Sequence, residues 1–232
     1  METGKIKPDR RGSWQQGCTA EVVYIGAAPG AACGETGSLD RIEAACSTPG
    51  HVASMHAHRH VEILTCVRSG TLLHVDSLGH EEKLSPGRLM LLDAGSLLHH
   101  EERTIGRDPV RGYHFYFRPD RGEHGATVQF LEAGTPPLDE WRLLASTGGA
   151  PMRLRSRAGV HDGRFSAGVH RFPPSGSGGR ILVVFEGRVR IGEERFERGD
   201  ILAVAAEETF QALESADLLL IEDRELSPTA GR

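Results

Sequence analysis

Two stretches of this chain repeat one order of short apolar runs and glycine turns. Residues 63–75 resemble residues 181–191, and each copy continues through a glycine turn into another apolar run, at 86–92 and at 198–204. The runs are short, rich in β-branched and aliphatic residues, and bounded by glycine and proline, as strands are. This order predicts a small β-barrel or jelly roll that occurs twice.

We therefore expect an all-β fold of two tandem jelly-roll barrels, residues 1–125 and 126–232, joined by the polar segment 118–125. One large sandwich whose hairpins look alike by chance is the alternative. A short helix is expected at 139–144, after Pro137. Strands are expected near 21–25, 41–45, 60–67, 71–76, 88–92, 98–102, 113–117, 153–155, 166–171, 180–185, 188–191, 194–196, 200–205 and 217–222.

Composition excludes several classes of protein. The 232 residues carry a net charge of -5, so nothing suggests a surface for nucleic acid or anionic lipid. No apolar stretch reaches the roughly 20 residues that a membrane span needs. The four cysteines form no CxxC pair, which argues against a thiolate zinc site. With no secretory signal visible, we expect a cytoplasmic protein with reduced cysteines.

Histidine is the residue that points to chemistry, because nine of the 12 lie between His51 and His114. In a strand, alternate side chains share a face, so His56, His58, His60 and Glu62 would lie together if this segment is extended. His100 and Glu102 would share a face in the same way.

Two such pairs on two strands of one barrel can converge on a metal ion. Imidazoles with a carboxylate suit Fe(II), Mn, Ni, Cu or Zn. Four protein ligands leave an octahedral ion room for two small ligands, as a catalytic ion requires.

The spacing resembles the cupin superfamily and, within it, the pirin family. The general cupin pattern has two motifs, and the histidine of the second motif would stand at Leu98. Here that histidine comes two places later, at His100. That offset is similar to pirin. The residues that match the pirin motifs are His56, His58, Arg59 and Glu62; His74, Asp76, Ser77 and Gly79; Pro86 and Gly87; Ala94 and Gly95; and His100 with Glu102.

The resemblance implies a monomeric bicupin with one ion, usually iron, held by His56, His58, His100 and Glu102 in the N-terminal barrel. Aligned on the repeat, the second copy has Ala212 in place of His100 and keeps only Glu214 as a carboxylate. One carboxylate is not a metal site, so the second barrel is expected to be structural.

Five further residues are candidates for orienting the ligands: His60, Glu62, His74, Asp76 and His99. Glu62 could equally be a ligand itself, and His74 with Asp76 could face the cavity or pair across a hairpin. His60 and His99 stand where the family usually has other residue types. The remaining histidines, His114 included, are expected to be surface or core residues.

The resemblance implies a dioxygenase of the quercetinase kind, with O2 and a flavonol-like or other enolisable hydroxy-ketone as substrates. Glu102 would be the catalytic residue, taking the proton of the substrate hydroxyl. Two alternatives remain: an iron-binding regulatory protein that senses redox state and acts through a protein partner, and a biosynthetic tailoring enzyme with the same site.

Overall fold

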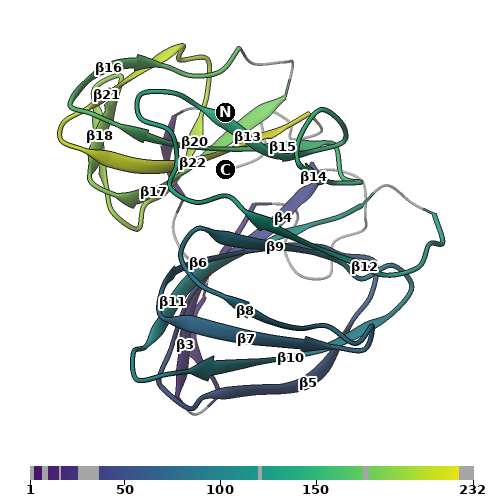
Figure 1. The fold of residues 1–232 in the computed structure, drawn as a ribbon. Helices are drawn as coiled ribbons and strands as arrows, with labels where there is room; N and C mark the ends of the chain where they lie inside the picture. The colour runs from purple at the N-terminus through teal and green to yellow at the C-terminus, as the bar shows by residue number, and fades with distance from the viewer. Residues whose placement is uncertain are drawn as a thin grey trace. The chain divides into compact units, whose positions relative to one another are not determined.

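The computed structural model describes residues 3–6, 10–15, 17–25, 37–119, 122–174 and 178–224. Within these ranges the chain forms strands and no helix, and so no helix that could cross a membrane. The predicted all-β class is confirmed. The strands belong to two compact units (Figure 1). The first unit is Pro8–Tyr24 with Asp40–Gly134, and the second unit is Met1–Lys7, Ile25–Leu39 and Thr135–Arg232.

The first unit consists of a seven-stranded and a four-stranded sheet. The larger sheet has the order β12 (Thr127–Glu132), β9 (Arg88–Asp93), β6 (Glu62–Ser69), β11 (Val110–Phe117), β4 (Leu39–Ser47), β3 (Cys18–Tyr24) and β2 (Arg10–Gln15). The smaller sheet has the order β5 (Val52–His58), β10 (Leu98–Ile105), β7 (Thr71–Asp76) and β8 (Glu81–Leu84).

Alternation along these strands builds the core of the first unit. Buried apolar side chains from both sheets form two clusters, one around Ile63, Leu92 and Leu98 and one around Val67, Leu72 and Met90. Between His100 and Glu102 the β10–β5 ladder shifts register, so that Glu102 is opposite Ala53 although His100 is opposite His56. The extra residue lies on β5, which is a β-bulge.

The second unit repeats this plan. Its seven-stranded sheet has the order β1 (Gly4–Lys5), β20 (Ile201–Val204), β17 (Gly179–Glu186), β22 (Ala216–Asp223), β15 (Ala158–Phe165), β13 (Arg142–Ser146) and β14 (Met152–Arg153). Its four-stranded sheet has the order β16 (Gly168–Arg171), β21 (Thr209–Ala212), β18 (Arg188–Ile191) and β19 (Glu194–Glu197). The two predicted copies of one jelly-roll plan are therefore present, and β5, β10 and β7 correspond by position to β16, β21 and β18.

The two units exchange short segments relative to the expected division at residues 125 and 126. β12 pairs with β9, so the chain stays in the first unit through Gly134. β1 pairs with β20, which brings the first residues of the chain into the second unit. Backbone hydrogen bonding, which a linker-like composition does not reveal, sets these boundaries.

The expected helix at 139–144 is wrong. Asp139 has a positive φ of 60°, and its carboxylate accepts hydrogen bonds from the backbone and hydroxyl of Ser166. The Asp139 amide donates to the carbonyl of Arg164 at 2.7 Å. These bonds tie the segment to the end of β15, and the chain then enters β13 at Arg142.

Candidate metal centre

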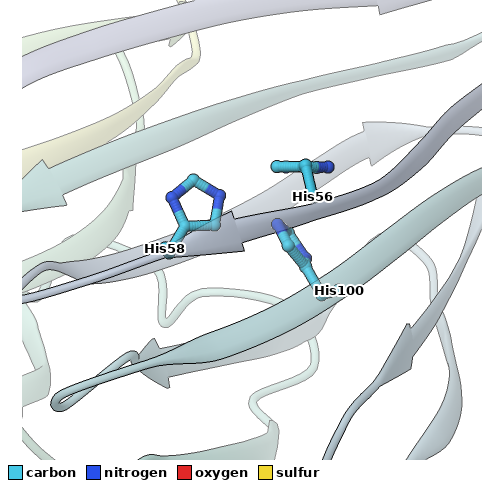
Figure 2. A group of neighbouring side chains, drawn as sticks. All are labelled: His56, His58 and His100. Atoms are coloured by element: carbon cyan, nitrogen blue, oxygen red, sulfur yellow. The ribbon is translucent and has the colours of Figure 1, made fainter.

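Two neighbouring strands of the smaller sheet bring three predicted ligands together. β5 carries His56 and His58, and β10 carries His100, which is directly opposite His56 in the antiparallel ladder. Alternation places both β5 imidazoles on the face that His100 shares. Figure 2 shows the three rings facing one another across the two strands.

The three imidazoles are close enough to share one ion. Their ring centroids are 4.4 Å apart for His56 and His100, 4.9 Å for His58 and His100, and 5.0 Å for His56 and His58. One nitrogen from each ring lies within 4.8 Å of the others. His100 is buried, His58 half-buried and His56 exposed, so the group opens to solvent on the β5 side.

The fourth predicted ligand, Glu102, groups with His100 and His74 instead. Ligand atoms of these three residues also lie within 4.8 Å of one another. β7 supplies His74, which is directly opposite Glu102 in the ladder with β10. His100 therefore belongs to both groups, with His56 and His58 in one and with His74 and Glu102 in the other.

The donor set fits a metal ion. Two buried ligand atoms, Nε2 of His100 and Oε1 of Glu102, have no hydrogen-bond partner. A buried polar atom without a partner costs about 1–3 kcal/mol, and a cation at this point would satisfy both. Three imidazoles and a carboxylate are ligands for a borderline divalent ion rather than for magnesium or calcium.

Hydrogen bonds fix which nitrogens face the ion. Nδ1 of His56 is 2.8 Å from the carbonyl of Ser54, and since a carbonyl only accepts, this nitrogen carries the proton. His74 lies 2.9 Å from the Asp76 carboxylate through Nε2 and 3.4 Å from Nδ1 of His100 through Nδ1. A neutral His74 that donates to Asp76 accepts from His100. In His56 and His100, Nε2 therefore remains free for the ion.

This chain of side chains continues to the surface. His80 approaches both carboxylate oxygens of Asp76 through Nδ1, at 3.1 and 2.9 Å. His74 and His80 hold the pKa of Asp76 below its ordinary value despite the opposing effect of burial. An ionised Asp76 therefore orients His74, which in turn orients His100. Of the two roles left open, His74 faces the site, whereas Asp76 pairs across the turn after β7 with His80.

Burial controls the protonation of the ligands. It lowers the pKa of His58 to about 4, with help from His56 and Arg41, and that of His100 to about 3. Both rings are therefore neutral and able to bind metal near pH 7. Burial alone would raise the pKa of Glu102, but His114, His100 and His74 together hold it at about 2.

His114 on β11 is a site residue that the sequence analysis missed. Its Nε2 is 3.6 Å from Oε2 of Glu102, and this carboxylate raises the pKa of His114 against the effect of burial. Parity offered a signal, because His114 and Tyr116 alternate along β11 with Tyr113, Phe115 and Phe117. In the folded chain, the face of β11 that carries His114 is directed toward Glu102 on β10 and so toward the ligand groups.

Tyr116 and two charged residues of β4 flank His58. The Tyr116 ring centroid is 6.4 Å from that of His58, and its hydroxyl donates to Glu43 at 3.0 Å. The guanidinium of Arg41 lies 3.6 Å from the Tyr116 ring centroid. This arrangement places a fixed cation and a fixed aromatic ring beside the open half of the group.

A small cavity lies on the closed side. It has a volume of about 60 Å³ and touches Glu102, His114, Thr65, Ser47 and Val67 among others. The hydroxyl of Thr65 is buried and lacks a hydrogen-bond partner. A cavity of this size holds one or two molecules as small as water.

Three other predicted residues lie outside both ligand groups. His60 does not continue the face of His56 and His58, because β5 ends at His58 and His60 has a φ of 51° in an exposed turn. Glu62 is fully buried at the start of β6. His99 lies on the opposite face of β10 from His100 and exchanges hydrogen bonds with Ser77.

The corresponding strands of the second unit hold no such group among the described residues. β16 carries His170, whose Nε2 donates to the carbonyl of Ser166 and whose ring packs on Phe165 and Phe210. Glu214 is exposed and paired with Arg188. The interior here is apolar.

Comparison with known proteins supports the resemblance to the pirin family. The sequence model described as "Pirin" matches residues 35–116. A Pseudomonas aeruginosa protein that carries the provisional name of a quercetin 2,3-dioxygenase is 29% identical over 176 residues, which are 72% of this chain and 75% of that protein. A pirin-like protein of Caulobacter vibrioides is 26% identical over 178 residues, which are 72% of this chain and 75% of that protein.

Among solved structures, the bacterial pirin YhhW of Escherichia coli in complex with nickel(II) has a TM-score of 0.77. It is 20% identical, and the match covers 95% of this chain and 98% of that one. At this identity the likeness concerns the fold. The resemblance to pirin that the motif spacing predicts is thus confirmed, both in the sequence of residues 35–116 and in the bicupin fold.

Proposed function

We propose that this protein is a mononuclear metal dioxygenase of the quercetinase kind, with a flavonol-like or other enolisable hydroxy-ketone and O2 as substrates. The observation that carries the proposal is the convergence of His56, His58 and His100, with Glu102 grouped beside His100 and with two buried ligand atoms lacking partners. The names of the relatives support the reaction class.

The two sides of the site suit two substrates of different size. A flavonol is far too large for a cavity of about 60 Å³, so it would approach from the open side, where His56 is exposed. There Arg41, whose side chain is 27% exposed, offers a positive charge to an enolate. The small apolar cavity beside Glu102 has room for a diatomic gas.

The side chains have separate roles in this proposal. Three imidazoles and Glu102 would hold the ion, which as a Lewis acid lowers the pKa of a bound hydroxyl. Glu102 is ionised at every pH near neutrality, so its Oε1 is available to accept the hydroxyl proton. Since Glu102 also raises the pKa of His114, at 3.6 Å, this imidazole would be a charge partner of the carboxylate rather than an acceptor for that proton.

We propose Fe(II) as the native ion, with Mn, Ni, Cu and Zn as the other candidates that this donor set admits. Cytoplasmic location, a monomeric state and the absence of a nucleic-acid partner stay expectations. A regulatory role through a protein partner is the alternative function.

The test is metal analysis of the purified chain followed by O2 uptake with quercetin and with simple hydroxy-ketones, after loading with each of the five ions. We expect one ion per chain and O2 consumption with at least one substrate. His56→Ala should lose both, whereas His60→Ala, in the exposed turn nearby, should keep the ion. A chain that binds one ion but consumes no O2 with any substrate would contradict the enzymatic proposal and leave the regulatory one.

A further inference from the structure

The second unit contains a cavity larger than the one beside Glu102, and nothing in the proposed function uses it. Its volume is about 490 Å³. The wall is formed by β13, β15, β17 and β22 of the seven-stranded sheet and by the segments that follow β14 and β22. The residues that matter for recognition are Leu143, Arg157, Gly159, His161, Arg180, Glu222 and Arg224.

Strand register shows that the cavity is the open end of the second barrel. Glu222 is opposite Arg180 on one side and Gly159 on the other. Glu222 has the same parity along β22 as Leu218 and Leu220, which belong to the apolar core of the barrel. The polar residues therefore continue the inner face of the barrel beyond its apolar part.

The polar wall has unused hydrogen-bonding capacity. Oε1 of Glu222 and Nδ1 of His161 are both buried and lack hydrogen-bond partners, and the two side chains are 3.9 Å apart at their nearest atoms. Burial raises the pKa of Glu222 and lowers that of His161. Two buried polar atoms without hydrogen-bond partners favour the binding of a ligand that forms hydrogen bonds with them.

Three arginines line the same cavity, together with the carboxylates of Glu222 and Asp223. Arg180 is 3% exposed and is held by the carbonyls of Ala205 and Glu207 at 2.8 and 2.6 Å. Arg157 and Arg224 are exposed at the rim. A guanidinium fixed by its own hydrogen bonds is preorganised for a carboxylate.

The absence of a side chain at position 159 creates part of the space. A Cβ at Gly159 would meet only the far ends of His161, Leu143 and Glu222, at 3.7, 3.9 and 4.0 Å, which is ordinary contact. A methyl group is thus tolerated there, while a longer side chain would extend into the cavity.

From these observations we infer that the open end of the second barrel binds a small organic acid that also carries a hydroxyl group. The carboxylate would lie near Arg180 and the rim arginines, the hydroxyl would donate to Glu222 or His161, and Leu143 with Pro174 would contact the carbon skeleton. The site is separate from the proposed metal centre and does not depend on the proposed function.

The test is calorimetric titration of the full metal-loaded chain with 4-hydroxybenzoate, which has both groups and does not chelate metal. Benzoate lacks the hydroxyl and 4-hydroxybenzyl alcohol lacks the carboxylate. We expect one site per chain, with benzoate about fivefold weaker and the alcohol at least about tenfold weaker, as the loss of one neutral or one charge-assisted hydrogen bond predicts.

Variants locate the binding. Gly159→Leu should weaken 4-hydroxybenzoate at least about tenfold by filling the cavity, whereas Gly159→Ala should bind within about threefold of the parent chain. Glu222→Gln should reduce the preference for 4-hydroxybenzoate over benzoate without unfolding the barrel. His100→Ala should bind normally, since its change lies in the other unit.

Several results would overturn the inference. These are the absence of binding up to 10 mM (about the weakest affinity that calorimetry of this kind detects), equal binding by Gly159→Leu and Gly159→Ala, or loss of binding in His100→Ala. If Gly159→Leu does not fold by circular dichroism, an unchanged preference in Glu222→Gln overturns it instead.

Discussion

The two units share one arrangement of strands but differ in what fills the barrel. In the first unit, β5, β10 and β7 point His56, His58, His100, His74 and Glu102 inward. In the second, the same positions in the smaller sheet lie against an interior of Phe165, Phe172, Phe196 and Phe210, with Trp141 packed on them.

The difference separates the requirements of the fold from those of the site. The second interior shows that this strand order is satisfied by apolar packing alone, so the histidines of the first are not needed to form a barrel. Their burial has a cost, seen in the unpartnered atoms of His100 and Glu102 and in the lowered pKa values of His58 and His100. Residues kept in such a state are candidates for function.

The largest effect should come from creating a cavity in the apolar interior of the second unit. Phe165 is 1% exposed and packs on Trp141 and Phe210, so Phe165→Ala should lower the free energy of unfolding by about 3–5 kcal/mol. Val169→Ala, at a residue 70% exposed, should change it by less than about 0.5 kcal/mol. Denaturant unfolding followed by circular dichroism measures both, and equal effects would mean that the second interior is not the packed one.

The next largest effect should come from replacing a histidine inside the first barrel with an apolar residue of the kind that fills the second. His100→Leu should weaken metal binding at least about a hundredfold, because His100 belongs to both ligand groups. The metal-free variant should be as stable as the parent or more stable by about 1 kcal/mol, since an unpartnered buried nitrogen disappears.

Titration with metal measures the expected loss of affinity, and unfolding of the metal-free protein measures the expected change in stability. The matched control is His170→Leu in the second unit, which should bind the ion normally. A His100→Leu chain that keeps its ion, or that unfolds much more readily when metal-free, would show that the histidine has a structural role after all.

A smaller effect should follow from changing the chain of side chains behind His100. Asp76→Asn keeps the shape of the carboxylate but removes the charge that orients His74, so metal affinity should fall about tenfold. His80→Ala, one step further out, should have less than half that effect on the free energy of binding. Competition with a chelator measures both affinities; Asp76→Asn with parent affinity would separate His74 from the site.

The smallest effect concerns pH. The pKa values of His58 and His100 in the folded chain, about 4 and about 3, lie below the ordinary value of 6.5. Between pH 6.5 and 4.5 the unfolded chain therefore binds more protons, and the stability of the metal-free protein should fall as the pH falls. Glu102 adds its loss only below pH 4.5, and His114, whose pKa is raised, opposes the fall only near pH 6.5, where the unfolded imidazole is half protonated.

Unfolding of metal-free protein at several pH values tests the sign. His100→Leu should show a shallower fall between pH 6.5 and 4.5 than the parent chain, whereas His170→Leu should match the parent. A stability that rises as the pH falls through this window would contradict the direction given for both imidazoles.

Repetition and parity made much of this molecule predictable. Apolar runs bounded by glycine gave β6, β7, β9 and their counterparts, and the i, i+2 spacing placed His56 with His58 correctly. β15 was not expected, because Gly159 and Gly163 and the polar residues between them hide its alternation. The turn at His60 and the pairing of His114 with Glu102 depend on backbone conformation and on a strand distant in sequence, which spacing along one strand cannot reveal.

The position of β5 separates how tightly an ion is held from how quickly it leaves. Among the strands that the structure describes, β5 is the end strand of its sheet and pairs only with β10, and its bulge lies next to His56. Detaching it breaks a single ladder, whereas displacing His100 or His74 requires breaking ladders on both sides of an inner strand. Such partial opening needs less free energy than global unfolding. Residence time should therefore be adjusted by substitutions along β5, and equilibrium affinity by those behind β10.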